Sequence, residues 1–173
     1  MSNHYDQSRE REKDQIQKKT MSQQFLTFTV HQEEYGVDIM TVREIKGWSE
    51  TTRLPNSPDF MRGVMNLRGL IVPIFDLRTR FSFGMTETTT KHVVIILAVG
   101  ERNIGILVDT VSDILEVKQE QIKPAPAGKT QVDSAFISGL ISINERMVVL
   151  LDVERLFDTR QLVQEKEQEE QVS

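Results

Sequence analysis

The chain has 173 residues, no cysteine and a formal net charge of −5. Without cysteine it can form neither disulfides nor thiolate zinc sites nor a cysteine nucleophile, as expected of a protein of the reducing cytosol. The absence of a basic stripe argues against nucleic-acid binding. The longest apolar run, residues 93–99, is far below the roughly 20 residues of a membrane helix, so no membrane insertion is expected.

The first half of the chain predicts short strands joined by turns. Residues 1–22 are polar and predict a disordered or flexible tail. Alternation predicts a strand over 24–30, a turn at 32–34 and a returning strand over 35–39. A short helix over 41–45 and a strand over 51–54, stopped by Pro55, follow. Residues 65–67 and 70–75 then predict a hairpin across Arg68-Gly69, and Asp76 caps a helical turn ending at Phe81.

The second half predicts the same order of elements. After a linker at 86–90, residues 93–99 pair with 103–108, and a strand over 111–114 follows. Residues 139–143 pair with 147–151, and Asp152 caps the last helix. Residues 159–173 form an acidic C-terminal tail.

The two halves are an internal repeat. Residues 63–81 read GVMNLRGLIVPIFDLRTRF and residues 139–157 read GLISINERMVVLLDVERLF, with Asp76 and Asp152 at equivalent positions. The repeat predicts an all-β fold of two small barrels, at 23–85 and 86–158. Because a module of about 65 residues is marginal by itself, the two should share an apolar seam and exchange terminal segments.

Candidate chemistry does not assemble into a catalytic or metal site. The three histidines, His4, His31 and His92, lack metal-ligand spacing and are interpreted as surface residues. Asp76 and Asp152 stand where helix caps stand, so capping is preferred to a carboxylate pair.

A second chemical candidate, a phosphate loop, also fails. Gly128-Lys129-Thr130 resembles the end of such a loop, but Lys123 stands where the loop requires glycine. No cofactor is therefore predicted.

The tip of the first hairpin is the best candidate for an interaction surface. Arg68 is expected to project from the turn beside an exposed Leu67 or its neighbours, and Pro73 suggests an edge strand. Arginine is enriched in interface hot spots, although a solvated turn arginine is the simpler alternative.

These residues also resemble a known family. Asn66-Leu67-Arg68-Gly69 followed by LIVPIFDLR resembles the signature of the CheW family of bacterial chemotaxis coupling proteins, as do residues 34–39, 42–45 and 121–126. The resemblance spans about residues 23–157. It implies two intertwined five-stranded SH3-like barrels with short helices and a C-terminal helix.

The resemblance further implies a cytoplasmic, non-enzymatic adaptor of membrane receptor arrays. Its partners would be the cytoplasmic tip of methyl-accepting chemoreceptors and the regulatory domain of the histidine kinase CheA. One alternative is a related non-flagellar chemosensory system, or a detached module of a CheW-containing fusion. Another is a small enzyme using Asp76 or His92.

The resemblance assigns two sets of contact residues. The receptor-binding set lies in the groove between the barrels: Val42, Glu44, Arg62, Gly63, Asn66, Arg68, Val111 and Ile114. The kinase-binding set is Ile39, Leu67, Ile122, Lys123 and Pro124.

Physical chemistry supports the groove assignment and leaves one alternative open. A helical receptor tip would lay an apolar face on Val42, Val111 and Ile114, with Arg68 and Glu44 setting the register at the rim. Val42 and Val111 are equivalent in the repeat, and they fill the barrel cores in the alternative interpretation. Gly128 replaces a family aromatic anchor in the inserted segment 118–134, which predicts weaker ring closure with the kinase.

Overall fold

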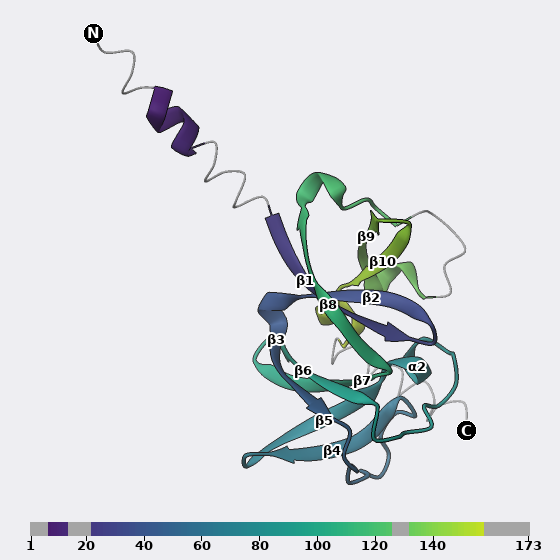
Figure 1. The fold of residues 1–173 in the computed structure, drawn as a ribbon. Helices are drawn as coiled ribbons and strands as arrows, with labels where there is room; N and C mark the ends of the chain where they lie inside the picture. The colour runs from purple at the N-terminus through teal and green to yellow at the C-terminus, as the bar shows by residue number, and fades with distance from the viewer. Residues whose placement is uncertain (1–6, 14–21, 126–131, 158–173) are drawn as a thin grey trace.

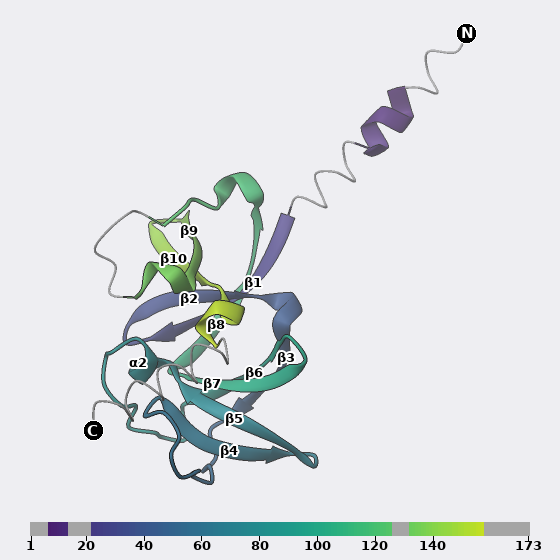
Figure 2. The same cartoon turned by 180° about the vertical axis from the view of Figure 1, so that it is seen from behind.

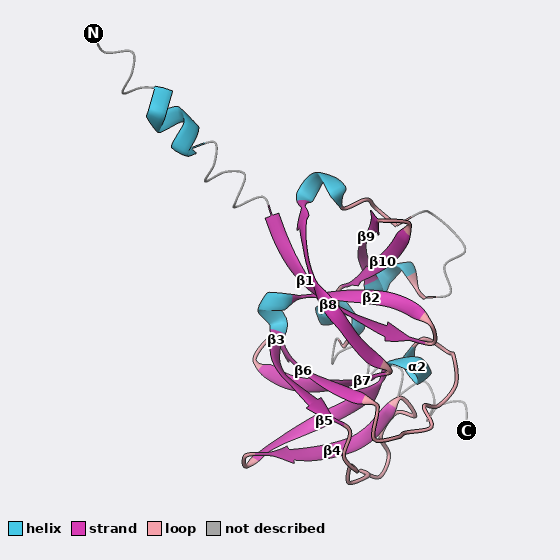
Figure 3. Ribbon diagram, viewed as in Figure 1, coloured by secondary structure: helices cyan, strands magenta, loops and turns pink. Residues whose placement is uncertain are grey.

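The computed structural model describes residues 7–13, 22–125 and 132–157. Residues 7–13 form a short exposed helix, and strands dominate the remainder (Figure 3). The strands are β1 (Ser22–Val30), β2 (Glu33–Asp38), β3 (Val42–Gly47), β4 (Met61–Leu67), β5 (Leu70–Asp76), β6 (Val93–Val99), β7 (Arg102–Val108), β8 (Thr110–Lys118), β9 (Ile137–Ile143) and β10 (Arg146–Leu151). Besides the helix at 7–13, the helical elements are single turns: the 3₁₀ turns η1 (Ile39–Thr41), η2 (Gln119–Gln121) and η3 (Ser134–Phe136), and the helices α2 (Leu77–Arg80) and α3 (Val153–Leu156).

The strands form two five-stranded sheets, one above the other in Figure 1. The first sheet has the order β8-β1-β2-β10-β9 and the second β3-β6-β7-β5-β4. Each sheet therefore takes strands from both halves of the chain. Strands of the two halves meet twice in each sheet, at an antiparallel pair, β1 with β8 or β3 with β6, and at a parallel pair, β2 with β10 or β5 with β7. This topology confirms the prediction of two intertwined barrels.

The largest hydrophobic cluster runs between the two sheets. It unites Phe28 and Tyr35 of the first sheet with Ile95 and Ile106 of the second, and it includes Leu156 of α3. Each of these side chains is at most 1% exposed. Smaller clusters fill each barrel by itself. The predicted apolar seam is therefore confirmed, and separating the barrels would expose it to water.

Two elements differ from the prediction in the first half. Residues 42–47 form strand β3, antiparallel to β6, where a short helix was expected over 41–45. Burial alternates along β3, so pairing with β6 overrides the helical interpretation. The strand predicted over 51–54 is reduced to one bridge, from Thr52 to Val64.

Strand β5 is not an edge strand, so the expectation based on Pro73 is wrong. It lies between β4 and β7. Pairing with β7 begins only at Ile74, so Pro73 precedes the part of β5 that is paired on both sides. A proline there removes no bond from the β7 ladder.

Candidate protein-interaction site

The β4–β5 hairpin presents Arg68 on a two-residue turn. Arg68 and Gly69 have φ values of 52° and 87°, the left-handed conformations that tight hairpins with two-residue loops require. The Gly69 N–H donates to Asn66 Oδ1 at 2.9 Å, which closes the turn. In both views the hairpin extends from the edge of its sheet, away from the other sheet (Figures 1 and 2). This local geometry leaves the Arg68 side chain 77% exposed.

Arg68 and Glu44 connect the two ends of one sheet. The Arg68 guanidinium donates to Glu44 Oε2 at 2.7 Å, and Glu44 belongs to β3, at the opposite end of the strand order from β4. The structure thus brings together two residues of the predicted receptor set. An ion pair this exposed contributes at most about 1 kcal/mol to stability, so it orients charge at the surface more than it holds the fold.

Exposed apolar residues lie close in sequence to both members of this ion pair. Leu70 is 59% exposed and Ile71 64% exposed on the same hairpin, and Ile45, next to Glu44, is 47% exposed. Leu67 is only 9% exposed and packs inside the barrel. The expectation of an exposed Leu67 or neighbour therefore holds for the neighbours, and the hairpin offers both charge and apolar area.

The sequence analysis did not name Leu70 and Ile71 as the exposed neighbours, although the repeat contained a signal. The second copy places Arg146 and Met147 at the equivalent positions, directly after its own hairpin turn. An arginine is rarely buried without a partner. Its presence in one copy therefore indicates an outward-facing position in both.

The other end of β4 holds Arg62 and Gly63 in structural roles. The Arg62 guanidinium lies 5.6 Å from the ring centroid of Trp48 and 3.9 Å from Asp76 Oδ2. Gly63 has φ of +140°, and a Cβ there would lie 2.5 Å from the Thr52 carbonyl oxygen. Only glycine fits, so Gly63 shapes the surface through its backbone.

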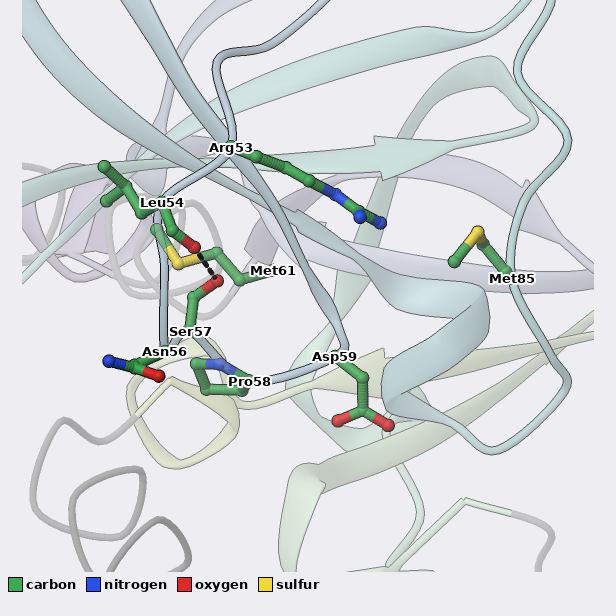
Figure 4. A pocket seen from close by; sticks show the side chains of 8 residues that line it. All are labelled: Arg53, Leu54, Asn56, Ser57, Pro58, Asp59, Met61 and Met85. Carbon is green, nitrogen blue, oxygen red and sulfur yellow. Dashed lines mark hydrogen bonds between the residues drawn. The ribbon is translucent and has the colours of Figure 1, made fainter.

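Arg62 lines one of two hollows that share Arg53 and Met85. One, of about 320 Å³, is lined by Trp48, Arg53, Arg62 and Met85. The other, of about 260 Å³, shares Arg53 and Met85 (Figure 4). There the Ser57 hydroxyl donates to the Leu54 carbonyl at 2.9 Å, which holds the loop between β3 and β4. These hollows offer cationic and apolar contacts to a protein surface.

The remaining predicted groove residues divide between core and surface. Val42 and Val111 are half-buried against the cluster between the sheets. Ile114, on the edge strand β8, is 55% exposed. The packing of Val42 and Val111 supports the core alternative for part of their surface, and Ile114 is accessible to a partner.

The predicted kinase set lies mainly near η1 and η2. Ile39 and Ile122 are half-buried against hydrophobic clusters. Lys123 and Pro124 are exposed, and the Lys123 backbone exchanges hydrogen bonds of 2.8 and 2.7 Å with Leu140. Leu67, buried in the barrel, has little side chain to offer. Gly128 lies outside the described residues.

The two aspartates are helix caps. Asp76 accepts from the Arg78 N–H at 3.0 Å and Asp152 from the Arg155 N–H at 3.2 Å. Asp76, fully buried, also accepts from the Thr86 N–H at 2.9 Å and the Thr86 hydroxyl at 2.6 Å. Both Asp76 oxygens therefore serve structural hydrogen bonds. In the described part of the chain, no group of three acidic, histidine or cysteine side chains is arranged to hold a metal ion.

Comparison with known proteins identifies relatives that match most of this chain. The chain is 46% identical over 143 residues to the chemotaxis protein CheW of Klebsiella aerogenes, covering 83% of this chain and 86% of that protein. It is 41% identical to a probable chemotaxis protein CheW of Rhizobium etli, covering 78% and 86%. The crystal structure of the scaffolding protein TtCheW from Thermoanaerobacter tengcongensis superposes with a TM-score of 0.73 at 31% identity, covering 79% of this chain and 88% of that one.

Within the described residues, no helix is long and apolar enough to cross a membrane.

The family model of the CheW-like domain matches residues 24–161. This match covers the two intertwined barrels and the hairpin that carries Arg68. The chain belongs to the CheW-like domain family.

Proposed function

We propose that this protein is a chemotaxis adaptor that couples the cytoplasmic tips of chemoreceptors to the histidine kinase CheA in signalling arrays. Its relatives are named chemotaxis proteins CheW, and one solved relative is described as a scaffolding protein. The exposed hairpin and the hollows in the described part of the chain offer surfaces for protein contacts, which supports an adaptor role.

One observation carries the proposal: Arg68 is held by a tight turn and is still 77% exposed, with exposed Leu70 and Ile71 beside it. Preorganised arginine with adjacent apolar area is typical of binding hot spots. A helical receptor tip would place its apolar face on such a surface and pair an acidic side chain with Arg68.

The proposed receptor contacts keep the predicted set, with roles adjusted to the geometry. Arg68, Glu44, Asn66 and Ile114 make direct contact, because their side chains reach the surface or, for Glu44, meet Arg68 there. The other four, Arg62, Gly63, Val42 and Val111, shape the surface from below.

The proposed kinase contacts center on η1 and η2. Lys123 and Pro124 contribute exposed side chains, Ile39 and Ile122 contribute edges of half-buried ones, and the buried Leu67 supports the hairpin. By holding the kinase and receptor in one geometry, the adaptor lets the receptor state bias the kinase equilibrium.

The decisive experiment measures binding to each partner separately. The parent protein, Arg68→Ala and Arg146→Ala are titrated with a receptor cytoplasmic fragment and with a CheA regulatory domain. Arg146 is the matched control, because it follows the equivalent hairpin turn of the second copy and is paired with Glu34. We expect Arg68→Ala to weaken receptor binding about tenfold or more and leave kinase binding unchanged.

Two results would contradict the proposal. If the parent protein bound neither partner, the adaptor role would be excluded. Equal receptor binding by Arg68→Ala and the parent protein, with both folded, would exclude the hairpin as the receptor site.

A further inference from the structure

The junction between the two barrels contains a polar cluster around Asp109. This residue lies in the single-residue connection from β7, in one sheet, to β8, in the other. Its Oδ2 accepts from the backbone N–H of His31 at 2.9 Å and from the Arg78 guanidinium at 2.8 Å. Its Oδ1 lies 3.5 Å from His92 Nε2. One carboxylate therefore joins three segments that are far apart in the sequence.

These segments belong to different barrels. His31 lies in the β1–β2 turn of the first sheet, and Arg78 lies in α2, which follows β5 of the second sheet. Both views place α2 at the junction of the two sheets (Figures 1 and 2). Arg78 also bonds His31 directly, with 3.3 Å between its Nη1 and the imidazole Nδ1. The ion pair between Arg78 and Asp109, with the hydrogen bonds to His31, thus connects a turn of one barrel to a helix of the other.

The cluster is more constrained than a surface ion pair. The side chains of Arg78 and Asp109 are 26% and 21% exposed, and that of His92 is 16% exposed. The His31 ring stacks on Phe83 with centroids 4.5 Å apart. The surface interpretation of His92 is therefore too simple, because its ring is partly buried and faces Asp109.

The cluster also holds the ends of strands that carry the proposed receptor contacts. Asp109 donates its N–H to the Thr29 carbonyl at 2.9 Å, immediately before β8, the strand of Val111 and Ile114. The His92 carbonyl accepts from the Trp48 N–H at 3.0 Å, at the end of β3, the strand of Val42 and Glu44. Two strands that carry four of the eight proposed receptor contacts therefore end at the same cluster.

We propose that Asp109 is a positioning residue that locks the angle between the two barrels and thereby sets the receptor groove. The carboxylate acts through Arg78 and His31 and need not touch the receptor. This inference rests on the proposed receptor coupling, but the lock itself is measurable without any partner. An adaptor that transmits a conformational bias requires its two faces to be held in a fixed relation.

The lock is tested by measuring a distance between the barrels. Because the chain contains no cysteine, Ser142→Cys in β9 and Glu101→Cys in the β6–β7 turn place one spin label on each sheet at exposed positions. Double electron–electron resonance is recorded for the labelled parent, Asp109→Asn, Arg78→Gln and the control Glu34→Gln. Glu34 pairs with Arg146 within one sheet, between β2 and β10, so its loss removes an ion pair without touching the junction.

We expect Asp109→Asn and Arg78→Gln each to broaden or shift the distance distribution, and Glu34→Gln to leave it unchanged. Receptor binding should fall about fivefold or more in the first two variants. Arg78→Gln keeps the test decisive if Asp109→Asn does not fold. An unchanged distribution in a folded junction variant, or an equal change in Glu34→Gln, would overturn the lock.

A changed distance with unchanged receptor affinity would overturn the positioning role. If the parent protein binds no receptor fragment, the proposed function fails, and the spin-label distances still decide whether the lock exists.

Discussion

The two capping aspartates provide a matched pair for a stability experiment. Asp76 and Asp152 occupy the same place in the repeat, and the backbone N–H of each donates to a phenylalanine carbonyl, at 2.7 Å to Phe60 and 2.9 Å to Phe136. Their side chains differ: that of Asp76 is fully buried, and that of Asp152 is 33% exposed. Replacing each by alanine therefore compares a buried cap with an exposed one in the same local fold.

The magnitude follows from the hydrogen bonds. Asp76→Ala removes three bonds to the carboxylate and leaves the N–H groups of Arg78 and Thr86 without their partner. Removing one partner of a buried charged network costs about 3–5 kcal/mol. Asp152→Ala removes one cap bond of 3.2 Å to Arg155, which costs about 1 kcal/mol.

Urea unfolding followed by far-ultraviolet circular dichroism measures both values. We expect Asp76→Ala to lower the free energy of unfolding by about 2 kcal/mol or more beyond the loss caused by Asp152→Ala. Asp76→Asn, which keeps one side-chain oxygen as acceptor, should lie between the parent and Asp76→Ala. Equal losses for the two alanine variants would refute the argument that burial makes Asp76 the stronger cap.

Three further predictions concern Gly63, Tyr35 and Arg68. Gly63→Ala should destabilise the fold by about 3 kcal/mol, because its Cβ would meet the Thr52 carbonyl. Gly69→Ala, at positive φ with no atom within 4 Å of the added Cβ, should lower the free energy of unfolding by about 1 kcal/mol. Similar losses for the two variants in urea unfolding would contradict this prediction. Burial and the neighbouring Glu33 raise the pKa of Tyr35. Its contribution to the free energy of unfolding is therefore complete below the unfolded pKa of about 10 and is lost as the pH rises above that value. The alkaline loss of unfolding free energy should be smaller in Tyr35→Phe than in the parent protein, and an unchanged pH profile would count against this prediction. Arg68→Ala should change the unfolding free energy by less than about 1 kcal/mol, so a larger thermal shift would show that the exposed pair is structural.

Much of the secondary structure was accessible to sequence reasoning because its causes are local. Alternation along 24–30, the Arg68-Gly69 turn and the apolar run at 93–99 each predicted an element that the structure contains. The aspartate caps were also predictable, since an N-cap needs only its own helix turn. The repeat added the intertwined pair of modules, because two copies of a marginal unit stabilise each other through a shared core.

Other features depended on contacts between distant residues. Residues 42–47 form a strand because β6 is available as a partner, although a short helix was predicted over 41–45. Pro73 was compatible with an interior strand because β7 pairs only from Ile74 onward. Neither register could be read from the neighbours of these residues in the sequence.

The candidate site divides in the same way. The sequence by itself determined that a tight turn presents Arg68, because the turn residues and flanking strands are adjacent in the chain. Only the tertiary structure decided that Glu44 pairs with Arg68 and that Asp109 accepts hydrogen bonds from both Arg78 and His31 at the barrel junction. Burial and charge pairing depend on which distant segments meet, and that is established only when the strands of both halves assemble into the two sheets.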